Sequence, residues 1–342
     1  MKEIDEKYMQ ICLDLAKQGF GSVLPNPMVG CVVLDKSGNI VSKGYHKKYG
    51  ENHAERDALL KLKNNEAEGG TLYVNLEPCS HYGKTPPCVD LIIERKIKRV
   101  VIAMRDVNPK VDGVKKLLEE GIDVTVGVLE AEARFLNRVF IKNMSQKLPY
   151  VVLKTATTMD GKIATKTGSS KWITSQESRA EVYEMRQQFD CIMTSSNTVI
   201  ADNPTMEHKF KCILDKDLRI SPDAKIYEQG EIYVASRKNT SLVDGCLGLR
   251  EILSTLYQKG ICTVFVECGG TLAGALLREG LIDEIFQFIA PKIVNDNSAK
   301  SCFDGDEIFD ISDCKQLQIY ETKLVGKDLL IKSLVTNKKG EI

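Results

Sequence analysis

Short apolar segments alternate with amphipathic segments along most of the chain. In the first half, the apolar segments are short and rich in valine or isoleucine; they cover residues 28–35, 71–77, 99–106 and 123–130. Residues 53–63 and 89–98 lie between them and carry apolar side chains at helical spacing, as amphipathic helices do. This alternation predicts α/β architecture.

A second run of strand-like segments follows a helix and connector expected over residues 130–149. The strand-like segments are residues 150–164, 190–195, 211–215, 231–236, 262–267, 285–293 and 328–335. We therefore expect two domains, residues 1–145 and 146–342. Each exceeds the roughly 100 residues at which a single hydrophobic core is commonly sustained.

The amino-terminal segment is charged and amphipathic. Tyr8, Ile11, Cys12 and Leu15 fall at helical spacing, which predicts a first helix and not a signal peptide. No apolar run approaches the ~20 residues that span a bilayer. We expect no membrane partner.

The composition bears on which partners and which cellular location are expected. Lys and Arg total 47, as do Asp and Glu, so the net charge is zero. This argues against a nucleic-acid partner, although a local basic patch can lie within a neutral total. Of the eleven cysteines, most lie in apolar segments, which predicts buried free thiols and a cytoplasmic location. Cys79 and Cys88 differ, because they lie among Pro, Gly, Ser and His.

These two cysteines and an upstream His-Ala-Glu, residues 53–55, form a candidate zinc site. His53, Cys79 and Cys88 can supply three ligands, which leaves the fourth tetrahedral position open for water. Zinc lowers the pKa of that water toward neutrality. Glu55 is the candidate for proton transfer. Two alternatives stay open: His81 completes a closed structural site, or the cysteines bind no metal.

The order of the motifs is that of zinc nucleobase deaminases, in which H-x-E precedes P-C-x-x-C. Here eight residues, in place of two, separate Cys79 from Cys88. Thr85 followed by Pro86 and Pro87 predicts a helix start with Thr85 as the N-cap. Cys88 is then expected in the first turn, where the helix dipole favours a thiolate.

The segments PNPMVGCVV, GYHKKYGENHAERDAL and NLEPCSHYGKTPPC resemble the deaminase half of the bifunctional riboflavin-biosynthesis deaminase–reductases. That family joins a cytidine-deaminase-like zinc domain to a dihydrofolate-reductase-like domain. The resemblance implies zinc bound by His53, Cys79 and Cys88, with Glu55 in proton transfer. The further residues that it implies for the substrate pocket are Asn26, His46, His81 and Lys84. Asn26 and His46 also fit a turn and a strand end. Residues 105–122 follow the family less well, and no site residue is expected there.

In the second half, a strand leads into Gly269 and Gly270 and a helix is expected from about Thr271. Backbone N–H groups at such a turn can bind a phosphate, but the pair also suits a plain turn. TMDGKIAT, SSKWIT, MRQQFDCIMTSSNTVIADNP, ILDKDLRISPDAKI and VECGGTLAGALLREGLIDEIFQFIAPKI resemble the reductase half of the same family, which uses NADPH.

The resemblance assigns two sets of contacts in the second domain. Those to NADPH are Ala156, Trp172, Thr198, Asp202, Ser236, Gly269, Gly270, Thr271, Leu272, Ala273, Gly274 and Ala275. Those to the substrate are Ser170, Arg186, Met206, Lys209 and Glu267. Lys209 stands where the family usually has Arg, and Ser195 and Asn197 stand where glycine is common. Trp172 also fits a core or rim aromatic, Asp202 a turn, Arg186 a solvated helix charge and Lys209 a surface lysine.

The resemblance implies two consecutive reactions. Zinc-dependent hydrolysis deaminates 2,5-diamino-6-ribosylamino-4(3H)-pyrimidinone 5′-phosphate, and NADPH then reduces the ribosyl group to a ribityl chain. The expected partner is this small pyrimidine ribose phosphate, and homo-oligomerisation stays open. Two rival hypotheses are a nucleic-acid base deaminase with an accessory domain and a non-catalytic protein in which zinc only stabilises a loop.

Overall fold

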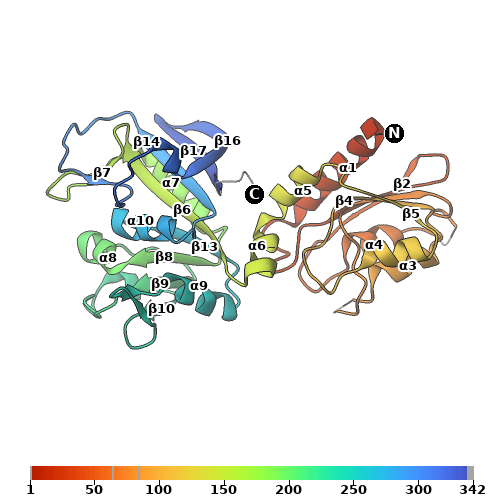
Figure 1. Cartoon of the computed structure of the whole chain (residues 1–342), viewed down its shortest axis with the longest axis horizontal. Coiled ribbons are helices and arrows are strands. Elements are labelled where there is room, and N and C mark those ends of the chain that lie inside the picture. The colour runs from red at the N-terminus through yellow and green to blue at the C-terminus, as the bar shows by residue number, and fades with distance from the viewer. Residues whose placement is uncertain (1, 64, 84, 337–342) are drawn as a thin grey trace. The chain divides into compact units, whose positions relative to one another are not determined.

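The computed structural model describes residues 2–63, 65–83 and 85–336. The chain divides into two compact units, Met1–Lys147 and Leu148–Ile342 (Figure 1). The boundary expected from the sequence, after residue 145, falls in the last turn of helix α6 (Arg138–Gln146). Both units combine helices with a central sheet, which confirms the α/β architecture.

The first unit contains a five-stranded sheet with the strand order β2-β1-β3-β4-β5. Strands β3, β4 and β5 are parallel, and β1 runs antiparallel to both of its neighbours. The strands are β1 (Gly30–Leu34), β2 (Ile40–Tyr45), β3 (Thr71–Leu76), β4 (Arg99–Met104) and β5 (Asp123–Val126). The helices are α1 (Lys2–Ala16), η1 (Lys17–Gly19), α2 (Ala54–Leu59), α3 (Cys88–Glu94), α4 (Gly113–Glu119), α5 (Glu130–Leu136) and α6.

Two glycines let helices pack directly on opposite faces of this sheet. A Cβ atom at Gly30 would lie 2.0 Å from the Cys12 carbonyl oxygen of α1. A Cβ atom at Gly44 would lie 2.5 Å from the Ala54 oxygen and the Ala58 nitrogen of α2. Gly44 pairs with Cys31, the residue after Gly30, and successive strand residues face opposite sides. Helices α1 and α2 therefore cover different faces.

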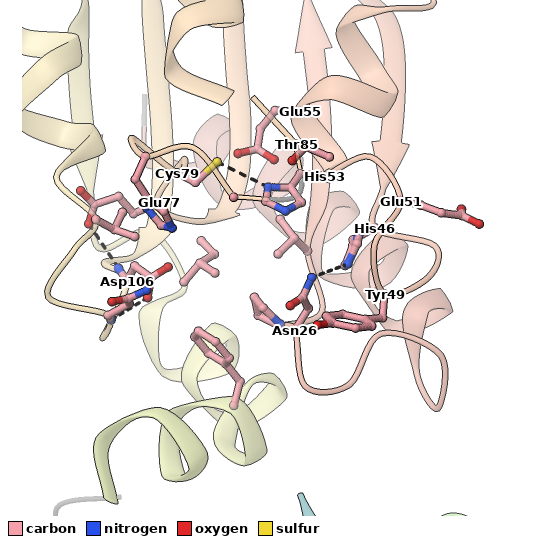
Figure 2. A pocket seen from close by; sticks show the side chains of 18 of the residues that line it. Asn26, His46, Tyr49, Glu51, His53, Glu55, Glu77, Cys79, Thr85 and Asp106 are labelled. Atoms are coloured by element: carbon pink, nitrogen blue, oxygen red, sulfur yellow. Dashed lines mark hydrogen bonds between the residues drawn. The ribbon is translucent and has the colours of Figure 1, made fainter. Parts of the chain in front are cut away.

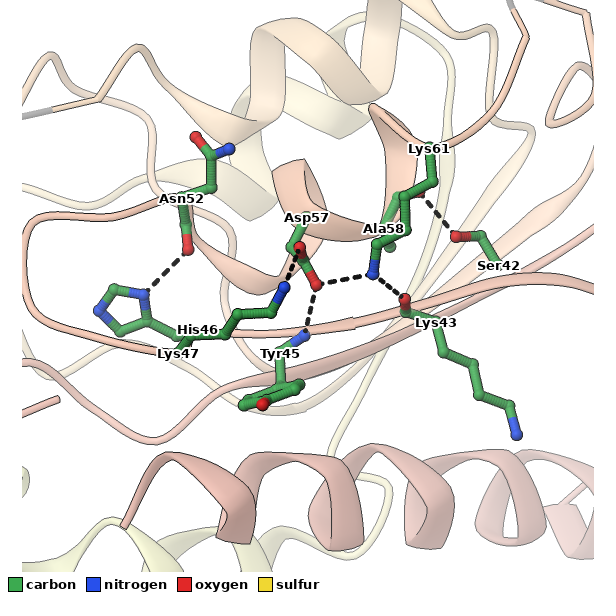
Figure 3. Close-up of polar contacts among 9 residues, drawn as sticks. All are labelled: Ser42, Lys43, Tyr45, His46, Lys47, Asn52, Asp57, Ala58 and Lys61. Carbon is green, nitrogen blue, oxygen red and sulfur yellow. Dashed lines mark hydrogen bonds and ion pairs between the residues drawn. The ribbon is translucent and has the colours of Figure 1, made fainter. Parts of the chain in front are cut away.

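Polar contacts also hold α2 on β2 (Figure 3). The backbone N–H of Tyr45 in β2 donates to Asp57 of α2 at 3.3 Å. Asp57 also pairs at 2.8 Å with Lys61, which in turn donates to the Lys43 carbonyl of β2 at 2.8 Å, and at 3.1 Å with Lys47. The Ser42 hydroxyl of β2 donates to the Ala58 carbonyl at 2.7 Å. The first turn of α2, which carries the His-Ala-Glu motif, is thus fixed on the sheet.

The second unit contains an eight-stranded sheet with the order β10-β9-β8-β13-β6-β14-β17-β16. The six strands from β10 to β14 are parallel, and β17 and β16 add an antiparallel edge. The strands are β6 (Tyr150–Thr158), β8 (Cys191–Ser195), β9 (Phe210–Leu214), β10 (Glu231–Ala235), β13 (Thr263–Glu267), β14 (Glu284–Ala290), β16 (Gln316–Val325) and β17 (Asp328–Thr336). All residues of β9 and β13 are buried, as in a parallel sheet covered on both faces.

The remaining elements of the second unit connect or cover these strands. The helices are α7 (Gln176–Arg186), α8 (Ser196–Asp202), η2 (Lys225–Tyr227), α9 (Leu249–Gln258), α10 (Gly270–Arg278) and η3 (Ile311–Asp313). Two small sheets pair β11 (Leu242–Val243) with β12 (Cys246–Leu247) and β15 (Lys300–Ser301) with β7 (Lys162–Ala164). Across the described parts of both units, every helix is too short or too polar to span a bilayer.

Replacing Gly44 tests the close packing of α2. We expect Gly44→Ala to lower the free energy of unfolding of the first unit by about 1–3 kcal/mol, the usual cost of overpacking. Chemical denaturation of the full chain measures this change. Gly83→Ala is the control, because a Cβ atom there meets nothing within 4 Å. Equal stability of the two variants would contradict the packing argument.

Candidate functional sites

Three segments of the first unit bring the predicted zinc ligands together. His53 precedes α2, Cys79 follows β3, and Cys88 is the first residue of α3. His53 Nδ1 lies 3.5 Å from Cys79 Sγ (Figure 2) and 3.6 Å from Cys88 Sγ. All three ligand atoms lie within 4.8 Å of one another. Tetrahedral zinc with ordinary Zn–N and Zn–S bonds places nitrogen and sulfur about 3.6 Å apart. The donor set therefore fits zinc.

The two thiols differ in their electrostatics. The hydrogen bond with Cys88 is the main cause that lowers the pKa of Cys79, to about 4. The same interaction and burial raise the pKa of Cys88 well above its ordinary value. The Cys88 backbone N–H also donates to Cys79 Sγ at 3.3 Å. Pro87, and not the expected Thr85, is the N-cap of α3, and the Cys79 sulfur accepts from the first of the helix N–H groups that have no partner within the helix.

Glu55 lies in the first turn of α2 and lines a cavity of about 250 Å³ together with His53 and Cys79. In Figure 2 its carboxylate lies beside both of these residues. The side chain is buried, and burial raises the pKa of Glu55 to about 7. A carboxyl group that titrates near neutral pH is suited to both accept and release a proton.

Asn26 and His46 line the same cavity and contact each other. The Asn26 amide nitrogen lies 3.1 Å from His46 Nε2, and His46 Nδ1 lies 3.0 Å from the Asn52 carbonyl oxygen. The amide donates to Nε2, so Nδ1 carries the proton that is donated to Asn52. Burial lowers the pKa of His46, which agrees with this neutral tautomer.

The structure adds Asp106 and Asn108 to the cavity lining, although no site residue was expected in this region. Glu77 explains their position, because its carboxylate accepts from the backbone nitrogens of Asp106 at 3.2 Å and Val114 at 2.9 Å. Burial raises the pKa of Asp106 to about 6. A sequence signal existed: polar residues that follow β4 lie at the carboxyl edge of parallel strands, where ligands commonly bind.

His81 also lines the cavity but does not belong to the group of potential metal ligands among the described residues. Its buried Nδ1 has no hydrogen-bond partner. The donor set thus matches the three-ligand pattern of catalytic zinc sites better than a closed four-ligand site. Lys84 lies outside the described residues.

In the second unit, several of the expected cofactor residues follow strands of the same sheet. Thr198 follows β8, Ser236 follows β10 and Gly269 follows β13. These strands belong to one parallel array, so their carboxyl ends share an edge, which is where open α/β sheets bind ligands. The Arg219 guanidinium lies at this edge as well, donating to Ser196 at 2.9 Å and to Asn197 at 2.6 Å. This cation was not expected from the sequence.

The residues of the glycine-rich turn differ in accessibility. A Cβ atom at Gly269 would meet nothing within 4 Å, whereas one at Gly270 would lie 2.8 Å from the Asp304 carboxylate. Thr271 donates to that carboxylate at 2.8 Å. Gly274 is also packed against Asp304, so close chain packing requires these two glycines. Gly269 thus remains the accessible end of the turn for a phosphate.

Three residues after the turn take part in packing. Ala273 lies in the hydrophobic core, and Leu272 and Ala275 pack against it. These residues hold α10 on the sheet, and their contact with a cofactor stays a prediction.

The expected substrate residues Arg186 and Glu267 form a buried ionic cluster with Lys154. The Glu267 carboxylate lies 2.5 Å from Arg186 Nε and 3.3 Å from Lys154 Nζ. Burial acts to raise the pKa of Glu267, but the two cations outweigh it and lower the value to about 2. Lys154 was not expected from the sequence, because a single lysine within an apolar strand gives no spacing signal.

The other expected residues vary in exposure. Trp172 is 62% exposed, with the Arg179 guanidinium 4.3 Å from its ring centroid, so it is not a core aromatic. Asp202 and Lys209 are exposed, and Ala156 and Ser170 are half-buried. The side chain of Met206 packs in a small apolar cluster, and its contact with a substrate stays a prediction.

Models of known protein families match the two units of this chain separately. Residues 2–104 match the cytidine and deoxycytidylate deaminase zinc-binding region, and residues 149–331 match the RibD C-terminal domain. The riboflavin biosynthesis protein RibD of Aquifex aeolicus is 41% identical, over 97% of this chain and 98% of its own. RibD of Escherichia coli is 38% identical, over 96% and 98%.

Two solved structures resemble this chain over nearly its whole length. Form 1 of Acinetobacter baumannii RibD is 35% identical, with a TM-score of 0.84, and covers 98% of this chain and 100% of its own. A Thermotoga maritima protein is 35% identical, with a TM-score of 0.82 and coverage of 98% and 99%. It is described as a diaminohydroxyphosphoribosylaminopyrimidine deaminase/5-amino-6-(5-phosphoribosylamino)uracil reductase.

The fold and the zinc-ligand geometry define a cytidine-deaminase-like domain fused to a dihydrofolate-reductase-like domain. The chain belongs to the RibD family: it is a bifunctional riboflavin-biosynthesis enzyme, with a zinc-dependent deaminase and an NADPH-dependent reductase.

The buried cluster gives a pH-dependent prediction. Glu267→Gln removes the buried carboxylate from two cations whose side chains are only 16% and 21% exposed. It should therefore lower the free energy of unfolding at pH 7, by up to about 3–5 kcal/mol. The pKa of Glu267 is lower in the folded state than its ordinary value of 4.5. The carboxylate therefore stabilises the fold fully above about pH 4.5, and this contribution is lost as the pH falls toward 2.

Denaturant unfolding of the wild type and the variant between pH 7 and pH 2 measures the effect. The difference between them should shrink steadily below about pH 4.5. The control is Glu321→Gln, which removes a carboxylate from the more exposed pair with Lys332. A difference for Glu267→Gln that stays constant with pH would rule out the charge as its cause.

Proposed function

We propose that the first unit deaminates 2,5-diamino-6-ribosylamino-4(3H)-pyrimidinone 5′-phosphate with zinc held by His53, Cys79 and Cys88. The observation that carries this proposal is the donor spacing of 3.5 and 3.6 Å beside a buried glutamate in one cavity. The description of the Thermotoga maritima neighbour as a deaminase and reductase supports the choice of substrate. When bound, zinc supplies an activated water at neutral pH.

The surrounding residues then have distinct roles. Glu55 accepts the proton of the attacking water and delivers it to the leaving amine. Asn26 and the neutral His46 hold the pyrimidine edge. Asp106 and Asn108 line the same cavity and offer polar groups to the rest of the substrate. Burial of the site excludes bulk water, which strengthens each of these polar contacts.

The second unit is proposed to reduce the deaminated product. When bound, NADPH supplies the hydride, and the protein positions its donor and the C1′ atom of the opened sugar. Thr198, Ser236 and the turn at Gly269 hold the cofactor, with Ala156, Trp172 and Asp202 completing its site. This assignment is supported by the shared carboxyl edge of the parallel strands.

Substrate contacts in the reductase are assigned to a separate set. Glu267 and Arg186, together with Lys154, orient the sugar hydroxyls through fixed charges. Ser170 and the exposed Lys209 bind its phosphate, and Met206 contributes its backbone. A lysine contacts phosphate as a point charge, whereas arginine can donate two parallel hydrogen bonds. We therefore expect Lys209 to bind the phosphate more weakly than an arginine would at this position.

The rival hypothesis of a nucleic-acid deaminase receives less support. The net charge is zero, and the cavity of about 250 Å³ is of a size for a small ligand. The rival in which zinc only stabilises a loop leaves the buried Glu55 without a role. A cytoplasmic location remains a prediction from the free thiols, and a homo-oligomer remains open.

The role of Glu55 is tested by Glu55→Gln in the full-length chain. Ammonia release should fall at least about 100-fold, because a positioned acid–base group commonly contributes that much. Bound zinc and NADPH oxidation with the deaminated substrate should stay at wild-type values. Glu51→Gln is the control, since Glu51 borders the same cavity but is exposed. Retained deamination would exclude the proton-transfer role, and loss of zinc would instead indicate a ligand.

A further inference from the structure

Helices α5 and α6 lie between the two regions that match known families, residues 2–104 and 149–331. Even so, this segment reaches the deaminase cavity. Phe140 of α6 is buried and lines the cavity. One turn earlier, Asn137 joins the two helices. The segment is therefore part of the deaminase unit and more than a connector.

The Asn137 side chain does not make the hydrogen bond that its position at the start of α6 would suggest. Asparagine at a helix N-cap normally accepts a bond from the first turn. Asn137 is the N-cap of α6 but makes no such bond, and its side chain is 2% exposed. Its Oδ1 instead accepts from the Met28 backbone nitrogen at 2.8 Å, and its Nδ2 donates to the Met28 carbonyl at 3.0 Å. Both amide groups thus bind one peptide segment.

The Met28 segment needs this support because it lies beyond the β-ladder. The last pair between β1 and β3 is Cys31 with Val74. Beyond that pair, Asn75 of β3 accepts from the Gly30 nitrogen at 2.8 Å and donates to the Met28 carbonyl at 3.0 Å. Buried backbone groups require partners. Two asparagine side chains therefore take the place of a neighbouring strand at Met28.

The clamped segment carries residues of the cavity. Asn26 is two positions before Met28 and donates to His46 at 3.1 Å. The carbonyl of Val29, the residue after Met28, accepts from the His46 backbone nitrogen at 2.9 Å. Displacement of Met28 would therefore move both Asn26 and His46.

We propose that Asn137 is a positioning residue of the deaminase: by clamping Met28 it holds Asn26 and His46 in register with the zinc site. This inference rests on the proposed deamination. Helices α5 and α6 would then serve the deaminase reaction, because Asn137 clamps Met28 and Phe140 lines the cavity. Misplacement of about 1 Å can reduce an enzymatic rate by about 100-fold, so a clamp that lies outside the substrate cavity can still control turnover.

The test measures deamination by the full-length, zinc-loaded enzyme with the pyrimidine ribose phosphate. For Asn137→Ala, kcat per bound zinc should fall roughly 10- to 100-fold. Zinc content and reduction of the deaminated substrate should stay close to wild type. Tm should fall by only a few degrees, because Met28 loses the bonds to the Asn137 amide. Asn137→Asp retains an oxygen that accepts from the Met28 nitrogen but sets a second acceptor against the Met28 carbonyl, so it should not restore the wild-type rate. Ser145→Ala is the control, since Ser145 is an exposed residue of α6 that bonds only to Ile141.

A multiple-mutant comparison separates positioning from a general structural role. If Asn137 acts through Asn26 and His46, adding Asn137→Ala to a variant that already carries Asn26→Ala and His46→Ala should reduce kcat by less than about threefold, because coupled sites are not additive. Fully additive losses, unchanged kcat in Asn137→Ala, or a fall in zinc content and Tm that accounts for the lost rate would each overturn the proposal. Failure of the wild-type chain to deaminate this substrate would instead contradict the proposed function.

Discussion

The deaminase half depends on one constraint: three ligand atoms from three separate segments must meet within a few ångströms. The segment before α2, the loop after β3 and the start of α3 each supply one. Gly44 allows α2 to lie directly on β2, and the Asp57 contacts hold it there. The Cys88 backbone N–H donates to Cys79 Sγ, so the helix start supports the thiolate. Bound zinc would in turn stabilise this arrangement, because metal binding to a folded site contributes to folding.

The reductase half depends on a different principle. Its parallel strands end at one edge, where Thr198, Ser236 and Gly269 follow their strands, as ligand-binding residues commonly do. Lys209 directly precedes β9 and therefore lies at the opposite edge of the sheet. A buried carboxylate, Glu267, is held between Lys154 and Arg186. Such a cluster is a weak contributor to net stability but fixes charges in a defined geometry. Among the described residues, the group of potential metal ligands lies in the first unit.

Much of this organisation could be predicted from the sequence because its signals are local. Apolar runs located most of the strands, and the spacing of His53, Cys79 and Cys88 located the ligands. Edge strands were harder: β2 and β16 were missed, and β16 is mostly exposed, so it lacks the apolar run of a buried strand. Asp106 and Asn108 were missed although they follow a parallel strand, and Phe140 was missed because it reaches the cavity through tertiary packing. Met206 and Ala273 match motif positions, yet packing buries their side chains.

The central claim is that one chain carries two chemistries of which only one requires zinc. The most direct test removes zinc from the full-length enzyme and then measures each half-reaction separately on the same sample. Ammonia release from the pyrimidine ribose phosphate should be lost and should return when zinc is restored. NADPH oxidation with the deaminated substrate should remain nearly unchanged throughout. Loss of both activities while the second unit stays folded and binds NADPH would contradict the account.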